Sequence, residues 1–190
     1  MDEELHGYQG REEWMGVEYV TLRDVMPEHP RAVIVGLNPS PVSVAAGHYY
    51  QGQVGQRQLR RLAAAGLFSL PDGERTFEAA ALAAEVGFTD IVKRPTVGEK
   101  DLVPGELEHG RSLLASKLGE LEVPLVVCVF RQPVEALLGR SAAGGPGLQE
   151  ARTAWGAQVF RMPGPYDAAA KASAVMGELV DLLGQLPFDV

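Results

Sequence analysis

Short apolar runs alternate along the chain with longer stretches in which hydrophobic residues recur at helical spacing. Because buried apolar strands that alternate with helices favour parallel pairing, the pattern predicts an α/β fold, a three-layer α/β/α sandwich with a mainly parallel central sheet. We expect strands over 32–36, 124–130 and 157–161, a strand or loop over 88–92, helices over 55–65, 105–120, 132–139 and 168–184, and an alanine-rich helix over 77–85 that ends at Gly87.

The chain has the length and hydrophobic content of one domain. At 190 residues and 46% hydrophobic content, it can bury a substantial core, so we expect a single domain over 1–190. Residues 1–30 hold eight acidic side chains against Arg11 and Arg23. We expect this acidic N-terminal extension to pack on the domain or to be mobile. The glycine-rich stretch 141–147 predicts a hairpin-like connection rather than a domain linker.

Residues 31–50 carry the strongest chemical signal. The apolar strand 32–35 runs directly into a loop that contains Gly36, Asn38 and two prolines. Open α/β sheets bind ligands beyond the carboxyl ends of their strands, and Gly36 lets the backbone approach a ligand closely. The Asn38 amide both donates and accepts, so it could hold a water molecule and a planar amide-like ligand together. A rigid turn is the alternative interpretation of Asn-Pro-Ser-Pro.

A second segment, 87–102, predicts another wall of the same cleft. Asp90 stands between Thr89 and Ile91 after a short apolar stretch, and Lys93 and Arg94 follow it. The alternative for Asp90 is a solvated loop aspartate that caps the next turn.

Together the two segments resemble the mismatch-specific uracil-DNA and thymine-DNA glycosylase family of the uracil-DNA glycosylase superfamily. The resemblance extends from about residue 31 to about residue 138. The first motif is a Gly-hydrophobic-Asn-Pro loop, found here at Gly36, Leu37, Asn38 and Pro39. The second is a Gly-His-aromatic-Tyr run, found at Gly47, His48, Tyr49 and Tyr50. The third is a GFT-hydrophobic-basic-Thr segment within 87–102, whose KDL continuation is Lys100, Asp101 and Leu102.

The resemblance implies a DNA repair enzyme of the same fold. It would flip uracil, or thymine or a related base mispaired with guanine, out of DNA and hydrolyse the N-glycosidic bond to leave an abasic site. Asn38 would position the hydrolytic water against the sugar C1′, and Tyr50 would stack on the extruded base. Gly36 and the backbone at Leu37 and Tyr49 would line the base pocket.

Asp90 departs from the thymine-DNA branch, which carries an asparagine there. A carboxylate cannot donate a hydrogen bond unless it is protonated. Ionised Asp90 could instead accept the N3 proton of uracil, or act as a base on the attacking water. We favour the role as a base, because the neutral Asn38 amide cannot abstract a proton. Lys93 is the nearest lysine able to form a Schiff base, and we expect hydrolysis without such an adduct.

The superfamily's wedge loop, His or Asn followed by Pro-Ser, is degenerate in this chain. Its counterpart is Met162-Pro163-Gly164-Pro165-Tyr166, followed by Asp167 as the expected N-cap of the last helix. Tyr166 or the Gly164-Pro165 turn could fill the gap that a flipped base leaves. The alternative is a Pro-Gly turn with Tyr166 packed on the scaffold.

The net charge of −8 is unusual for a protein that contacts DNA phosphates. Beyond residue 30, however, 17 acids face 15 bases, and no acid lies between residues 31 and 61. A solvated helix face is the alternative for the three arginines of helix 55–65. The basic side chains that we expect to form a rim around the cleft are Arg57, Arg60, Arg61, Lys93, Arg94, Lys100 and Arg161.

The sequence does not indicate a metal site, a disulfide bond or a membrane-spanning segment. Cys128, the single cysteine, lies in an apolar run typical of a buried strand, and the four histidines lack zinc-ligand spacing. We therefore expect no metal and no cofactor. No apolar run is long enough to span a membrane and the acidic start is unlike a signal peptide, so we expect a cytoplasmic monomer whose partner is damaged or mismatched DNA.

Two other functional classes stay open. A catalytically weak DNA-binding or lesion-sensing module of the same fold would fit the degenerate wedge loop and the acidic charge. An unrelated hydrolase would use Ser40 or Ser43 with His48, although the chain has no GxSxG motif.

Overall fold

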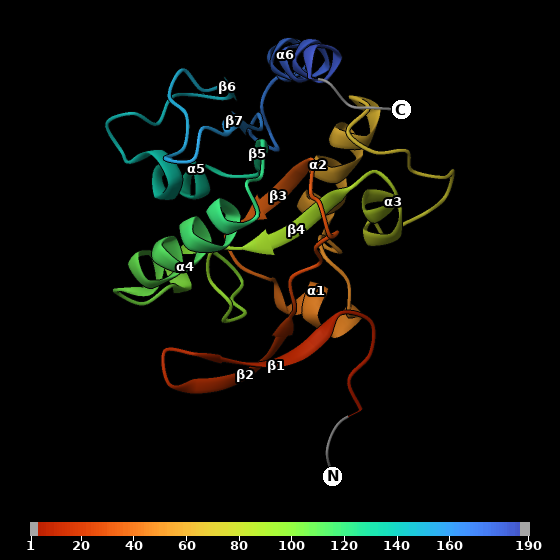
Figure 1. Ribbon diagram of the computed structural model, residues 1–190. Coiled ribbons are helices and arrows are strands. Elements are labelled where there is room, and N and C mark those ends of the chain that lie inside the picture. The colour runs from red at the N-terminus through yellow and green to blue at the C-terminus, as the bar shows by residue number, and fades with distance from the viewer. Residues whose placement is uncertain (1–3, 187–190) are drawn as a thin grey trace.

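A five-stranded sheet lies at the centre of the molecule. The computed structural model describes residues 4–186. The strand order is β4-β3-β5-β7-β6 (Figure 1). Parallel pairing joins β3 (Ala32–Gly36), β4 (Val86–Asp90), β5 (Leu125–Cys128) and β7 (Gln158–Arg161), and the short edge strand β6 (Gly147–Leu148) runs antiparallel to β7. The predicted α/β class with a mainly parallel sheet is therefore confirmed.

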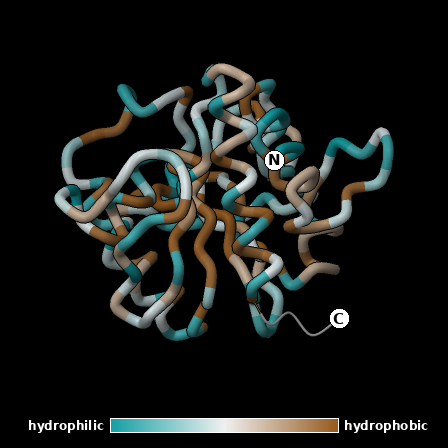
Figure 2. The backbone as a smooth tube through the Cα atoms, turned by 90° about the horizontal axis from the view of Figure 1, so that it is seen from above, coloured by the Kyte–Doolittle hydropathy of each residue, from teal (hydrophilic) through white to brown (hydrophobic). Residues whose placement is uncertain are grey.

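Helices cover both faces of this sheet. The helical segments are α1 (Pro41–Ala46), α2 (Gln53–Ala64), α3 (Glu78–Ala83), the short 3₁₀ helix η1 (Glu99–Asp101), α4 (Glu106–Glu120), α5 (Arg131–Leu138) and α6 (Ala169–Gln185). Side chains of alternating strand positions separate into two cores, as the two-residue period of a strand requires. Ile34 and Phe88 pack with α2, α3 and α6, whereas Val33 and Val126 pack with α4 and α5. Figure 2 shows the hydrophobic segments gathered in the middle of the molecule.

The described part of the acidic extension, residues 4–30, is ordered against the domain. It contains an antiparallel hairpin of β1 (Gln9–Trp14) and β2 (Val17–Leu22), which the sequence pattern had not predicted. The Trp14 indole donates to Glu106 of α4 at 3.0 Å, and the Thr21 hydroxyl donates to the Lys93 carbonyl at 2.6 Å. Val25 forms a bridge to Phe88, so this segment covers the free edge of β4.

The remaining predicted elements lie within a few residues of the observed ones, with one local correction. Asp167 does not cap α6, whose N-cap residue is Ala168. Its carboxylate instead accepts the Gly164 N–H at 2.8 Å and so closes the turn that precedes the helix. Across residues 4–186, no helix is both long and apolar enough to cross a membrane.

Candidate active site

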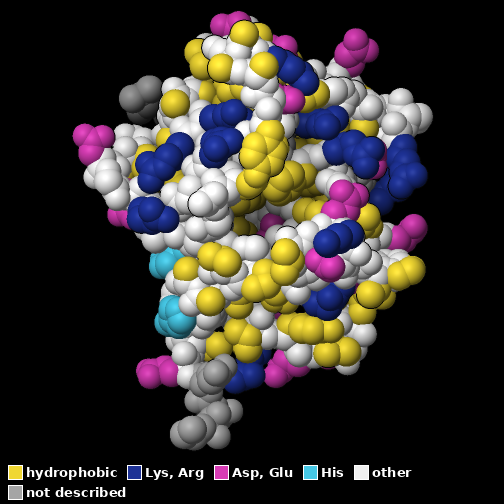
Figure 3. All heavy atoms as spheres, turned by 180° about the vertical axis from the view of Figure 1, so that it is seen from behind, with side chains coloured by type: hydrophobic (Ala, Val, Ile, Leu, Met, Phe, Trp, Pro, Cys, Tyr) yellow, Lys and Arg dark blue, Asp and Glu magenta, His cyan; other side chains and the backbone are white. Residues whose placement is uncertain are grey.

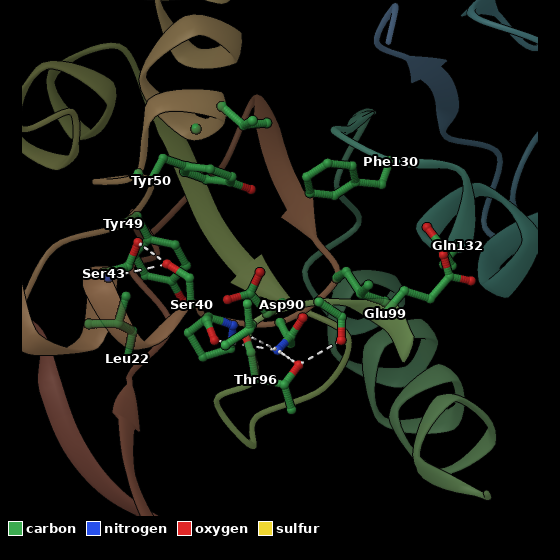
Figure 4. Close-up of a pocket in the computed structure, with 18 residues that line it drawn as sticks. Leu22, Ser40, Ser43, Tyr49, Tyr50, Asp90, Thr96, Glu99, Phe130 and Gln132 are labelled. Atoms are coloured by element: carbon green, nitrogen blue, oxygen red, sulfur yellow. Dashed lines mark hydrogen bonds between the residues drawn. The ribbon is translucent and has the colours of Figure 1, made fainter. Parts of the chain in front are cut away.

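A cavity of about 420 Å³ opens at the carboxyl ends of β3 and β4. Gly36 pairs with Asp90 across these strands, and the backbone pairing continues as Val92 N–H to Leu37 and Thr96 N–H to Pro39. The loops after β3 and β4 therefore form adjacent walls of one cavity, as the sequence predicts. Further walls come from Leu22 of β2 and from Phe130 and Gln132 after β5 (Figure 4).

Sequence reasoning missed these three residues. Phe130 is the last residue of the predicted strand 124–130 and Gln132 follows shortly after it, so their position at the carboxyl edge of the sheet was a usable signal. Leu22 had no such signal, because it reaches the cavity only through the unpredicted hairpin.

Gly36 is needed for the close approach of two side chains. A Cβ atom at this position would overlap Oδ1 of Asp90 and would lie 2.8 Å from the Tyr50 hydroxyl oxygen. Its role is thus to make room for the protein's own polar groups at the cavity floor. Any larger residue would push Asp90 or Tyr50 away.

The Asn38 side chain is held in one orientation. Its Nδ2 donates to the Thr96 hydroxyl at 2.6 Å and to the Thr96 carbonyl at 3.3 Å, while the Thr96 hydroxyl itself donates to the Gly98 carbonyl at 3.1 Å. Within residues 4–186, Oδ1 of Asn38 accepts no hydrogen bond. The arrangement therefore leaves one acceptor atom of fixed direction for a water molecule or ligand.

Asp90 is a buried carboxyl group with an unusual protonation equilibrium. It is the last residue of β4, is only 5% exposed and accepts no hydrogen bond from the described residues. Its pKa is raised from 3.8 to about 7, chiefly by burial and to a smaller extent by the charge of Asp24, against the opposing charges of Lys93 and Lys117. A solvated turn-capping aspartate is therefore ruled out. A carboxyl group with a pKa near neutrality is suited to accept a proton at physiological pH.

The two tyrosines after α1 have different environments. The Tyr49 side chain is buried, stacks on Phe88 at 5.3 Å and donates its hydroxyl to the Arg23 carbonyl at 3.1 Å. The Tyr50 ring borders the cavity beside Phe130 and across from Thr96, and its hydroxyl reaches toward Gly36 and Asp90 (Figure 4). The cavity therefore has an aromatic side and a polar side, which suits a planar heterocycle with polar edges.

Glu78 of α3 holds the turn that carries these tyrosines. One oxygen of its buried carboxylate accepts the Tyr49 N–H at 2.6 Å, and the other faces His48 Nδ1 at 3.2 Å. The Ser40 hydroxyl donates to the Ser43 hydroxyl at 3.0 Å, and neither serine side chain bonds the His48 ring. This geometry contradicts a serine hydrolase that uses His48 as its base.

The counterpart of the wedge loop, residues 162–166, is the third loop at this edge of the sheet, and helix α2 fixes it through three consecutive carbonyl groups. Gln58 donates to Pro163 at 2.9 Å, Arg61 to Gly164 at 3.1 Å and Arg57 to Pro165 at 2.9 Å. The Arg57 guanidinium also lies 5.6 Å from the centre of the Tyr166 ring, which is 79% exposed. The alternative in which Tyr166 packs on the scaffold is therefore wrong, and the loop presents an aromatic ring to solvent.

The basic rim differs from the one expected. Lys93 is 8% exposed and pairs with Asp24, as does Lys117 of α4, because the hairpin segment covers this side of β4. Lys93 thus does not belong to the rim. Arg94 is committed to buried Glu106 at 2.7 Å, whereas Arg60 is exposed and donates to the Glu74 carbonyl.

Basic side chains are nevertheless concentrated on part of the surface. Figure 3 shows a face with a hollow, where most of the Lys and Arg side chains gather on one half, while hydrophobic side chains lie on both halves and around the hollow. No group of three or more histidine, cysteine or acidic side chains within the described chain could hold a metal ion.

A sequence model of the Uracil DNA glycosylase superfamily matches residues 23–181. The match includes the β3 and β4 loops that border the cavity and also the third loop, which lies beyond the segments that carry the motif resemblance. It leaves out the whole of the N-terminal hairpin, which ends at Leu22.

Proposed function

Because this chain belongs to the Uracil DNA glycosylase superfamily, whose members are DNA glycosylases, we propose that it excises uracil from DNA by hydrolysis. Thymine or a related base mispaired with guanine is the second proposed substrate. The observation that carries the proposal is the cavity in which the oriented Asn38 amide and the buried Asp90 carboxyl lie on adjacent strand ends. The base must leave the helical stack to reach this cavity, and extrusion costs least at mismatched bases.

Asn38 and Asp90 have different roles in the proposed reaction. Oδ1 of Asn38 accepts a hydrogen bond from water and directs its oxygen at C1′ of the sugar. As the new C–O bond forms and the C1′–N1 bond breaks, the base leaves with the N1 electron pair. Ionised Asp90 takes the proton that the water loses. The product is an intact abasic sugar, and no metal or cofactor takes part.

The neighbouring surface supports the handling of a duplex. The third loop presents the exposed Tyr166 ring on a backbone clamped by α2, and an aromatic side chain of this kind can fill the space of an extruded base. Arg57 and Arg60 lie on the same helix and are exposed, so they are the proposed phosphate contacts. In this proposal Pro163, Gly164 and Pro165 contact the DNA, and the protein acts as a monomer.

Hydrolysis without a covalent adduct is supported by the position of Lys93. Its ammonium group pairs with Asp24 and does not border the cavity, so it is not available to attack C1′. Borohydride should therefore trap no protein–DNA adduct. A trapped adduct through Lys93 would contradict the monofunctional mechanism.

A panel of labelled duplexes tests the proposed substrates. Uracil opposite guanine, uracil opposite adenine, thymine opposite guanine, single-stranded uracil and an undamaged duplex would be incubated with the protein and scored for abasic sites by alkaline cleavage. We expect cleavage at uracil opposite guanine and none in the undamaged duplex. If no substrate yields abasic sites, the glycosylase proposal fails.

A lesion-sensing module is the second candidate. It is favoured by the third loop, where the one ionisable acid, Asp167, is engaged by Gly164 and by Lys171 at 3.3 Å. Preferential binding of uracil-containing duplex without any strand cleavage would identify this function.

A further inference from the structure

The Tyr50 hydroxyl is a polar atom that stacking alone does not require. It is buried and has no hydrogen-bond partner within the described chain. An unpaired buried hydroxyl is costly, and phenylalanine would offer the same ring surface without that cost. We therefore expect this hydroxyl to form a hydrogen bond in another protonation state of the site or when substrate is bound.

The Asp90 carboxyl lies near this hydroxyl, beside Gly36. If Gly36 carried a Cβ atom, that atom would contact both Oδ1 of Asp90 and the Tyr50 hydroxyl oxygen. These two oxygens therefore lie on the same side of the Gly36 Cα. Asp90 also accepts no hydrogen bond from the described residues, although a carboxylate has room for several. The Tyr50 hydroxyl, which has no acceptor, thus lies near the Asp90 carboxyl, which has no donor.

The backbone of Tyr50 is held in one conformation by its neighbours. Tyr50 has a φ of 57°, a left-handed conformation that is uncommon outside glycine. Gln56 donates to its carbonyl at 3.2 Å, and a Cβ on Gly55 would lie 2.8 Å from its Cα, which shows how tightly α2 packs there. Because Glu78 fixes the preceding N–H, the remaining freedom is rotation of the side chain beside Gly36 and Asp90.

We propose that the Tyr50 hydroxyl donates a hydrogen bond to ionised Asp90 and holds the second carboxylate oxygen toward the cavity. Tyr50 is then a positioning residue for Asp90 as well as a stacking surface. The consequence for catalysis rests on the proposed glycosylase function, whereas the hydrogen bond itself does not.

The other charged groups around Asp90 do not replace this donor. Lys93 and Lys117 favour the ionised form, but both pair with Asp24, which opposes it. Tyr49 and Cys128 have pKa values raised by burial and are neutral at physiological pH, and the Tyr49 hydroxyl is committed to a carbonyl. The remaining acid on the cavity wall is Glu99, which cannot donate when ionised.

Carboxyl ¹³C NMR of the free protein tests the hydrogen bond without any substrate. A donor to the charged form lowers a carboxyl pKa, so Tyr50→Phe should raise the Asp90 titration midpoint by about one to two pH units. Asp90→Asn assigns the signal. Tyr49→Phe is the matched control, since it removes a hydroxyl with a different acceptor and should leave the midpoint unchanged.

A second replacement guards against a general structural effect. Substituting 3-fluorotyrosine at Tyr50 makes the hydroxyl a stronger donor and should move the midpoint downward. An unchanged midpoint in Tyr50→Phe, or an equal rise in Tyr49→Phe, would overturn the proposal.

The pH dependence of uracil excision separates this inference from the proposed function. The midpoint of the single-turnover rate should rise in Tyr50→Phe by the same amount as the NMR midpoint. Asp90→Asn should remove this pH dependence of the rate, and adding Tyr50→Phe to Asp90→Asn should not restore or change it. If the NMR midpoint moves but the protein excises no base, the hydrogen bond stands and the glycosylase proposal fails.

Discussion

Replacing Asp90 with asparagine should change how stability depends on pH. The folded protein raises the pKa of Asp90 from 3.8 to about 7, chiefly through burial. Between these values the folded state holds more protons than the unfolded state, so unfolding becomes easier as the pH rises. The stabilisation is complete below the unfolded pKa and is lost as the pH rises through the folded one.

The magnitude follows from the size of the shift. At about 1.36 kcal/mol per pH unit, the interval from 3.8 to about 7 corresponds to ~4 kcal/mol in the free energy of unfolding. Asparagine keeps the shape but carries no titrating proton. The free energy of unfolding of Asp90→Asn minus that of the wild type should therefore increase with pH up to about 7 and then level off.

Urea unfolding at half-unit steps from pH 5 to pH 9 measures this difference. Asp167→Asn is the matched control, because the Gly164 N–H holds the pKa of Asp167 below its usual range and the residue does not titrate in this window. Its difference from the wild type should stay constant. A constant difference for Asp90→Asn as well would refute the argument that burial sets the protonation of this carboxyl.

Three further predictions concern Thr96 and Tyr50 of the cavity and Tyr166 of the third loop. Thr96→Val removes the hydroxyl that is the nearer of the two Thr96 acceptors of the Asn38 amide, and should slow uracil excision by about 10²-fold in single-turnover assays, with little change in binding; an unaltered rate would contradict the positioning role of the Thr96 hydroxyl. Tyr50→Ala removes a stacking surface of about 1–3 kcal/mol and should weaken catalysis on uracil at every pH, whereas Tyr50→Phe keeps the ring and should lose much less of the rate at pH 9; equal losses at pH 9 would argue against stacking. Tyr166→Ala should reduce excision from a duplex more than excision from a single strand, because only a duplex has a gap to fill; equal reductions would exclude a wedge.

The strands and the main cavity walls could be predicted from the sequence because their signals are local. The apolar run before Gly36 and the one before Asp90 each end in polar residues, and parallel pairing brings such ends together. The same logic could have included Phe130, which follows the next strand of the sheet.

The hairpin and the fate of Lys93 could not be predicted in this way. Several positions of β1 and β2 are glutamates, so the sequence of this segment resembles a polar extension. Only the structure shows that Trp14 of β1 binds Glu106 of α4. Lys93 looks exposed in a segment rich in charge, and only the long-range contact with Asp24 shows that it is buried. Both outcomes depend on contacts between residues far apart in the chain.

The central claim is that Asn38 and Asp90 together hydrolyse the glycosidic bond of uracil. Single-turnover rates on uracil opposite guanine, measured from pH 5 to pH 9 for the wild type, Asn38→Ala, Asp90→Asn and the double variant, test it most directly. The account predicts a wild-type rate that rises to a plateau above about pH 7, and an Asp90→Asn rate about 10²–10⁴-fold lower without that rise. Asn38→Ala should cost less. An Asp90→Asn protein with a near wild-type rate at every pH would contradict the account.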